Sequence, residues 1–166
     1  MRILLVDDHQ MVRLGLKSFF ELQDDIEEVT EATNGREGVE KALESRPDVI
    51  MMDIVMPEMS GIDATLAILK EWPEAKILIL TSYLDNEKIY PVLDAGARGY
   101  MLKTSSAEEI LHAVRKVAKG EFAIETEVSK KVEYHRNHIE LHEDLTARER
   151  DILGLLAKGY ENRSEE

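Results

Sequence analysis

The sequence contains no cysteine, and this absence removes several kinds of chemistry at once. Disulfide bonds, zinc sites built on thiolates and cysteine nucleophiles are all excluded within these 166 residues. Basic residues are also scarce, with 21 lysines and arginines against 34 aspartates and glutamates and a net charge of −13. Because phosphate contacts need a basic face, this balance argues against nucleic-acid binding by the chain as it stands.

Long apolar runs are missing as well. The apolar stretches are much shorter than the roughly 20 residues that a membrane-spanning helix needs. No basic segment followed by a signal-like apolar stretch opens the sequence either. We therefore expect a cytoplasmic protein without membrane association. The 43% of hydrophobic residues fits an ordinary globular core.

The stretch Pro47–Gly61 organises the rest of the sequence. Val49–Met52 is an uninterrupted apolar run, which is typical of a strand buried on both faces of a parallel sheet. Because proline and glycine punctuate the chain next, the strand must end between Asp53 and Pro57. Asp53 is therefore expected at the carboxyl end of a buried strand, where open α/β sheets bind their ligands.

The same strand-then-helix pattern repeats through the first 120 residues. Apolar, β-prone runs alternate five times with amphipathic segments, and the connections are a few residues long. This alternation predicts an α/β fold, a doubly wound five-stranded parallel sheet of the flavodoxin-like kind. The predicted strands cover about 2–6, 26–32, 49–52, 76–80 and 100–102, and the predicted helices about 11–20, 36–45, 62–72, 86–95 and 106–119.

The character of the sequence changes after residue 120. Residues 121–144 are polar and charged with sparse apolar positions, which indicates a helical linker. Residues 145–159 are amphipathic again, with a capping box formed by Thr146 and Glu149 at the start. We predict three parts: a domain over 1–120, a linker over 121–144, and the incomplete start of an all-α domain over 145–166.

Polar residues follow four of the predicted strands. Asp7 and Asp8 follow the first strand, Asp53 the third, Thr81 the fourth and Lys103 the fifth. Because the ends of parallel strands converge at one edge of a sheet, these residues are expected to meet. Crowded carboxylates repel one another and favour a cation, and oxygen ligands suit Mg²⁺, with Mn²⁺ as a substitute.

Lys103 and Thr81 extend this site toward phosphate chemistry. An ammonium and a hydroxyl can hold a phosphoryl group while Asp53 attacks it, because carboxylates are known nucleophiles for phosphate. Each residue alone has a plainer interpretation: Asp8 as a helix cap, Asp53 as a turn residue, Lys103 as a surface charge. The joint arrangement favours the phosphoacceptor hypothesis.

Short motifs around these residues carry a family resemblance. They are D-D-H at Asp7, M-D-I-V-M-P at Asp53, T-S at Thr81 and G-Y-M-L-K ending at Lys103. Together they resemble the receiver domain of a bacterial two-component response regulator. The tail L-T-A-R-E-R-D-I-L-G-L-L-A-K-G-Y-E-N resembles the opening of a LuxR-type helix-turn-helix domain. The whole is similar to cell-envelope stress regulators of this class.

The resemblance implies a role for each matching residue. Asp53 would accept the phosphoryl group, which Thr81 and Lys103 would contact. Tyr100, by itself a half-buried strand aromatic, would be a switch residue that turns inward as Thr81 moves. The implied metal ligands are one backbone carbonyl and three carboxylates: Val55 through its carbonyl, Asp8 and Asp53 directly, and Asp7 through water.

The resemblance also implies a function, that of a phosphorylation-dependent response regulator. Such a protein is not an enzyme beyond assisting its own phosphotransfer and dephosphorylation. A sensor histidine kinase would supply the phosphoryl group, and phosphorylation would promote a homodimer. The full-length protein would bind DNA through its LuxR-type domain, whereas residues 1–166 stop before the recognition helix and are expected not to bind it.

Two alternatives use the same residues differently. An aspartyl-phosphate hydrolase or phosphatase needs a second acid or base near the nucleophile and usually a cap domain, but Val55 stands where that group would be useful. A phosphate-independent, receiver-like scaffold would not need the set of Asp8, Asp53 and Lys103. Turnover of a simple phosphate ester distinguishes the enzyme from the switch.

Overall fold

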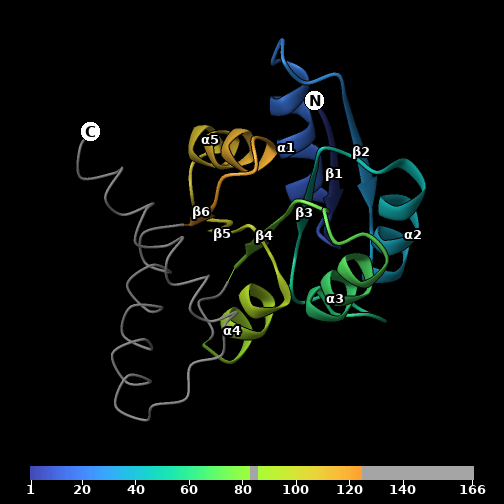
Figure 1. Cartoon of the computed structure of the whole chain (residues 1–166). Helices are drawn as coiled ribbons and strands as arrows, with labels where there is room; N and C mark the ends of the chain where they lie inside the picture. Colours follow the sequence, from blue (N-terminus) through green and yellow to red (C-terminus); the bar gives the residue numbers. More distant parts are fainter. Residues whose placement is uncertain (83–85, 125–166) are drawn as a thin grey trace.

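The computed structural model describes residues 1–82 and 86–124, which form a parallel sheet with helices on both faces (Figure 1). The sheet order is β2-β1-β3-β4-β5-β6. Its strands are β1 (Arg2–Val6), β2 (Glu28–Ala32), β3 (Val49–Met52), β4 (Ile77–Thr81), β5 (Gly99–Leu102) and β6 (Ala123–Ile124). The helices are α1 (Gln10–Glu21) and α5 (Ala107–Ala118) on one face, and α2 (Gly35–Ser45), α3 (Gly61–Glu71) and α4 (Asn86–Ala95) on the other.

The five predicted strands and five predicted helices are confirmed, but the sheet has six strands. The additional strand β6 pairs in parallel with β5, so that Gly99 lies beside Ala123 and Tyr100 beside Ile124. Two residues are too few to show an alternating pattern, and from sequence alone they belong to the linker. The remaining linker residues and the predicted all-α segment lie outside the described residues. The division into three parts therefore stays a prediction.

The apolar runs form two hydrophobic cores, one on each face of the sheet. Successive side chains of a strand point to opposite faces, so one continuous run supplies both cores. In β3, Ile50 and Met52 pack on the side of α2, α3 and α4, while Val49 and Met51 pack on the side of α1 and α5. The sheet is thus anchored on both sides, and its strand ends are held in fixed positions. Within the described part of the chain, no helix is long and apolar enough to cross a membrane.

Among the helices whose preceding residues the structure describes, α2, α3 and α5 begin with a capping side chain and α1 does not. Asn34, Ser60 and Ser106 cap α2, α3 and α5, each accepting a hydrogen bond from the backbone N–H three residues later. The residue that caps α1 is His9, and its side chain makes no capping hydrogen bond. The interpretation of Asp8 as a helix cap is therefore wrong, and its carboxylate is left for the edge of the sheet.

The loop from β3 to α3 is held by close backbone contacts. The N–H of Gly61 donates to the Ile54 carbonyl at 2.7 Å. A Cβ atom at Gly61 would lie 1.9 Å from the Asp53 carbonyl oxygen. A Cβ atom at Gly35 would lie 2.5 Å from the Met59 carbonyl oxygen. Because only glycine permits these approaches, the start of α3 fixes the backbone of Asp53.

Replacing Gly61 should therefore cost stability. We expect Gly61→Ala to lower the free energy of unfolding by about 3 kcal/mol, because the backbone must move to admit the methyl group. Gly15→Ala is the matched control. Nothing lies within 4 Å of a Cβ at that exposed site in α1, so this variant should gain about 0.5–1 kcal/mol from helix propensity. Urea denaturation measures both, and wild-type stability for Gly61→Ala would contradict the proposed contact.

Candidate functional site

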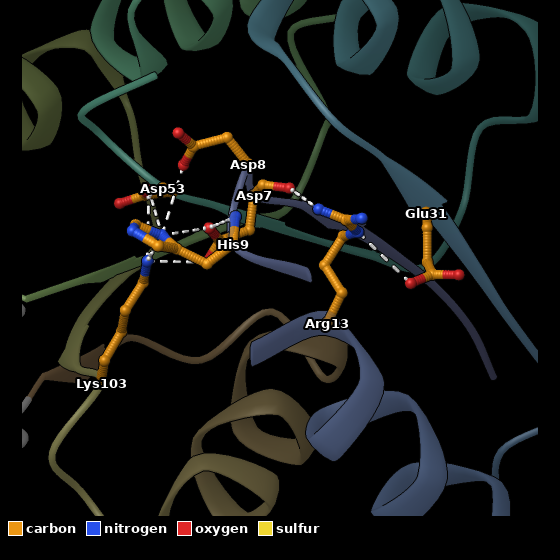
Figure 2. Close-up of polar contacts among 7 residues, drawn as sticks. All are labelled: Asp7, Asp8, His9, Arg13, Glu31, Asp53 and Lys103. Atoms are coloured by element: carbon orange, nitrogen blue, oxygen red, sulfur yellow. Dashed lines mark hydrogen bonds and ion pairs between the residues drawn. The ribbon is translucent and has the colours of Figure 1, made fainter. Parts of the chain in front are cut away.

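The carboxyl ends of the central strands bring Asp7, Asp8, Asp53 and Lys103 to one edge of the sheet (Figure 2). Asp7 follows β1, Asp53 follows β3, Thr81 is the last residue of β4 and Lys103 follows β5. The N–H of Asp53 donates to the Val6 carbonyl at 2.9 Å, and the N–H of Lys103 donates to the Thr81 carbonyl at 2.8 Å. The sheet hydrogen bonding thus continues one residue past the strands and positions both side chains.

The ammonium group of Lys103 lies between two buried carboxylates. Its Nζ is 2.7 Å from Oδ2 of Asp7 and 3.2 Å from Oδ2 of Asp53. The side chain of Lys103 is 9% exposed, and those of Asp7 and Asp53 are 7% and 4% exposed. Removing such charges from water costs several kcal/mol per ion, so each needs a partner. One cation against these two carboxylates and the adjacent Asp8 leaves the site negatively charged.

Asp53 has the environment expected of a reactive carboxylate. Burial raises the pKa of Asp53 above its usual 3.8, the neighbouring Asp7 carboxylate raises it further, and Lys103 lowers it. The raising effects dominate. The ammonium of Lys103 is at ion-pair distance, but within the described residues Oδ2 of Asp53 accepts no hydrogen bond. This buried oxygen therefore keeps lone pairs for a cation or for attack on an electrophile.

A metal-binding cluster surrounds these carboxylates. One ligand atom from each of Asp7, Asp8, His9 and Asp53 lies within 4.8 Å of the others, which fits the donors around one divalent ion. His9 has no role in the sequence prediction, although it directly follows the two aspartates in D-D-H. Val55 is half-exposed, with 49% of its surface accessible. Its role as a ligand through the backbone carbonyl stays a prediction.

The two predicted switch residues are both buried. Thr81 is buried at the end of β4. Tyr100 is 0% exposed in β5, where it packs with Val92 and Leu93 of α4 and with Ile124 of β6. The expectation of a half-buried aromatic is therefore wrong, because Tyr100 belongs to the hydrophobic core on the side of α2, α3 and α4.

Arg13 is a site residue that the sequence prediction missed. From α1, its Nη1 donates to the backbone carbonyl of Asp7 at 2.6 Å, and its Nε lies 3.4 Å from Oε1 of Glu31 on β2 (Figure 2). Through these two contacts, Arg13 connects the turn after β1 to α1 and to β2. Helical periodicity marks apolar positions only, so an arginine that contacts a backbone carbonyl leaves no signal in a single sequence.

Comparison with known proteins agrees with this geometry. The family model of the response regulator receiver domain matches residues 3–115. The chain belongs to the response regulator receiver family. The resemblance inferred from the motifs is thereby confirmed.

Similar proteins extend the likeness beyond the receiver. The transcriptional regulatory protein LiaR of Bacillus subtilis is 50% identical over 166 residues, which cover 98% of this chain and 79% of LiaR. The response regulator protein VraR of Staphylococcus aureus is 47% identical over 162 residues, covering 97% of this chain and 78% of VraR. A solved LuxR-family two-component response regulator from Aurantimonas sp. SI85-9A1 superposes with a TM-score of 0.76 at 32% identity, covering 81% of this chain and 96% of that one.

The raised pKa of Asp53 predicts a pH dependence of stability in metal-free buffer. The folded state holds the Asp53 proton more tightly than the unfolded chain does. Wild-type stability should therefore fall as pH rises from about 3.8 through the raised folded pKa. The side chain of Asp53→Asn does not ionise, so this variant should not lose stability over that pH range. We expect it to be more stable than wild type by about 1 kcal/mol at neutral pH.

Denaturation of both proteins across this pH range isolates the contribution of Asp53, because most other groups titrate alike in the two. The stability difference should shrink as the pH approaches the usual pKa of 3.8. A difference that does not change with pH would contradict the assignment.

Proposed function

We propose that this chain is a transcriptional response regulator that accepts a phosphoryl group on Asp53 from a sensor histidine kinase. The observation that supports this most strongly is the buried Asp53 carboxylate, flanked by the Lys103 ammonium and by two further carboxylates at the sheet edge. Family membership supports the same conclusion. A hydrolase would need a second acid or base beside the nucleophile, and the residue two positions after Asp53 is the apolar Val55.

The positions of these groups support a phosphotransfer to Asp53. A carboxylate oxygen of Asp53 attacks the phosphorus of a phosphohistidine, the oxygen–phosphorus bond forms, the phosphorus–nitrogen bond breaks, and the imidazole leaves with a proton. Lys103, which pairs with Asp53 beforehand, can then pair with a phosphoryl oxygen. The Thr81 hydroxyl contacts another of these oxygens.

The residues present fit a divalent ion beside the phosphoacceptor. Asp8 and Asp53 would hold Mg²⁺, with Mn²⁺ as a substitute, together with the Val55 carbonyl and with Asp7 through water. The buried oxygen of Asp53 that accepts no hydrogen bond from the described residues supports this assignment. When bound, the ion neutralises charge on the phosphoryl oxygens. Asp7 also holds Lys103 at 2.7 Å, which keeps the ammonium next to the reacting group.

Thr81 and Tyr100 would carry the signal away from the site. The phosphoryl group draws the Thr81 hydroxyl toward Asp53, and Tyr100 responds from the neighbouring strand β5, where it lies beside Ile79. Because the ring of Tyr100 is already buried, we propose that phosphorylation stabilises this inward packing. Such a shift needs only a difference in affinity between two existing states, equal to a few kcal/mol.

The similar proteins support a transcriptional output. LiaR is named a transcriptional regulatory protein, and we propose that the full-length form of this protein controls transcription through a LuxR-type DNA-binding domain. It would act in the cytoplasm, where a histidine kinase can reach it. The protein would not be an enzyme in the usual sense, because it assists only its own phosphotransfer and dephosphorylation.

The first test is phosphorylation by acetyl phosphate in the presence of Mg²⁺. Intact-mass measurement should show one phosphoryl group on wild type and none on Asp53→Ala, because the nucleophile is gone. Asp8→Ala should still be modified at high Mg²⁺ but should bind Mg²⁺ at least about tenfold more weakly. Asp63→Ala, which removes an exposed carboxylate from α3, is the control and should behave as wild type. Full modification of Asp53→Ala would overturn the assignment.

The second test concerns assembly. Closed two-fold pairing is the commonest way to use a changed surface, so we predict that phosphorylation promotes a homodimer. Sedimentation velocity with beryllofluoride and Mg²⁺, which mimic the phosphoryl group, should show a shift from monomer to dimer in wild type and no shift in Asp53→Ala. If wild type stays monomeric across the micromolar range, phosphorylation does not act through dimerisation.

A further inference from the structure

The functions assigned to the other site residues leave His9 without a role, although its ring lies within the acidic cluster (Figure 2). Its Nδ1 is 2.9 Å from Oδ1 of Asp7, 3.3 Å from Oδ1 of Asp8 and 3.9 Å from Oδ2 of Asp53. The backbone N–H of His9 also donates to Oδ1 of Asp7 at 2.9 Å, which fixes the residue in this turn. The ring is therefore held with one nitrogen facing three carboxylates.

The contacts of this nitrogen make incompatible demands. Nδ1 lies 3.0 Å from Nζ of Lys103, and an ammonium group only donates hydrogen bonds, so Nδ1 must offer its lone pair there. A hydrogen bond to Oδ1 of Asp7 at 2.9 Å requires a proton on the same Nδ1. One nitrogen cannot meet both demands at once. The conflict disappears when Nδ1 and the carboxylates present their lone pairs to one cation and the Lys103 ammonium pairs with the carboxylates alone, as it does with Oδ2 of Asp7 at 2.7 Å.

The spacing of the donor atoms also fits a shared ion. Ligands at about 2.1 Å from a metal in octahedral geometry lie about 3 Å apart when adjacent and about 4.2 Å apart when opposite. Nδ1 of His9 lies 3.3 Å from Oδ1 of Asp8 and 3.9 Å from Oδ2 of Asp53, the two proposed direct ligands, and both distances fall in this range. Oδ2 of Asp53 is an independent sign of a ligand, because it is buried and accepts no hydrogen bond from the described residues.

We propose that Nδ1 of His9 is a direct metal ligand and that it makes the site favour ions such as Co²⁺ and Ni²⁺ over Mg²⁺. Imidazole nitrogen suits these ions, whereas Mg²⁺ prefers oxygen ligands and retains its water. The inference rests on the proposed function only in taking Asp8 and Asp53 as ligands of the same ion. His9 then determines which ion the phosphorylation site binds, because the site contains a nitrogen ligand as well as oxygen ligands.

Calorimetric titration of the 166-residue chain with Co²⁺ and with Mg²⁺, at one constant pH, tests the selectivity. His9→Ala should weaken Co²⁺ binding at least about tenfold and Mg²⁺ binding by less than about threefold. His112→Ala, which removes an exposed histidine of α5 outside the cluster, is the matched control and should change neither affinity. In an Asp8→Ala background, the effect of His9→Ala on Co²⁺ should largely disappear, because a ligand of the same ion is already missing.

Pulsed electron paramagnetic resonance of the unaltered chain with bound Mn²⁺ gives a second readout that needs no variant to fold. A nitrogen coupling to the ion is expected, and it should vanish in His9→Ala and persist in His112→Ala. Absence of that coupling, or equal weakening of Co²⁺ and Mg²⁺ binding by His9→Ala, overturns the proposal. Phosphorylation of Asp53 by acetyl phosphate with Mg²⁺ is followed in parallel. If Asp53 is phosphorylated while the nitrogen coupling is absent, only the proposed role of His9 is refuted. If Asp53 is not phosphorylated, the proposed function is refuted.

Discussion

The burial of two adjacent carboxylates beside a single ammonium is the constraint on which the site depends. Asp7 and Asp53 are almost fully removed from water, and Lys103 lies within 3.2 Å of both. Desolvation of such charges costs several kcal/mol per ion, and one cation offsets only part of that cost. The excess negative charge raises the pKa of Asp53 and favours a divalent ion. The same Lys103 that stabilises the folded site can compensate the charge of an incoming phosphoryl group.

The fold keeps these groups in place through contacts away from the site. Apolar side chains on both faces of β1 and β3 anchor the strands that end at Asp7 and Asp53. Gly61 allows the start of α3 to rest against the Asp53 carbonyl, and Arg13 holds the Asp7 carbonyl from α1. In the proposed phosphotransfer, reacting groups held by packed elements would need little reorganisation, so a small domain could promote its own modification.

The sequence predicts the features that repeat or that end a strand. The apolar run Val49–Met52 and the aspartate after it suffice to place Asp53, because a buried parallel strand must end at a ligand-binding edge. The sequence does not predict β6, which is too short to show a pattern. Nor does it predict the full burial of Tyr100, which depends on a core built from several elements. The sequence does not predict the roles of His9 and Arg13, for another reason. Their contacts join residues whose proximity only the three-dimensional turn after β1 reveals.

Chemical mapping of the phosphorylated residue tests most directly whether Asp53 carries the phosphate. Borohydride reduces an aspartyl phosphate to homoserine, so reduction of the phosphorylated chain followed by tandem mass spectrometry locates the modified residue. Homoserine is expected at position 53, and unmodified aspartate at positions 7 and 8. Homoserine at position 7 or 8, or phosphate recovered on a serine, threonine or histidine, would contradict it.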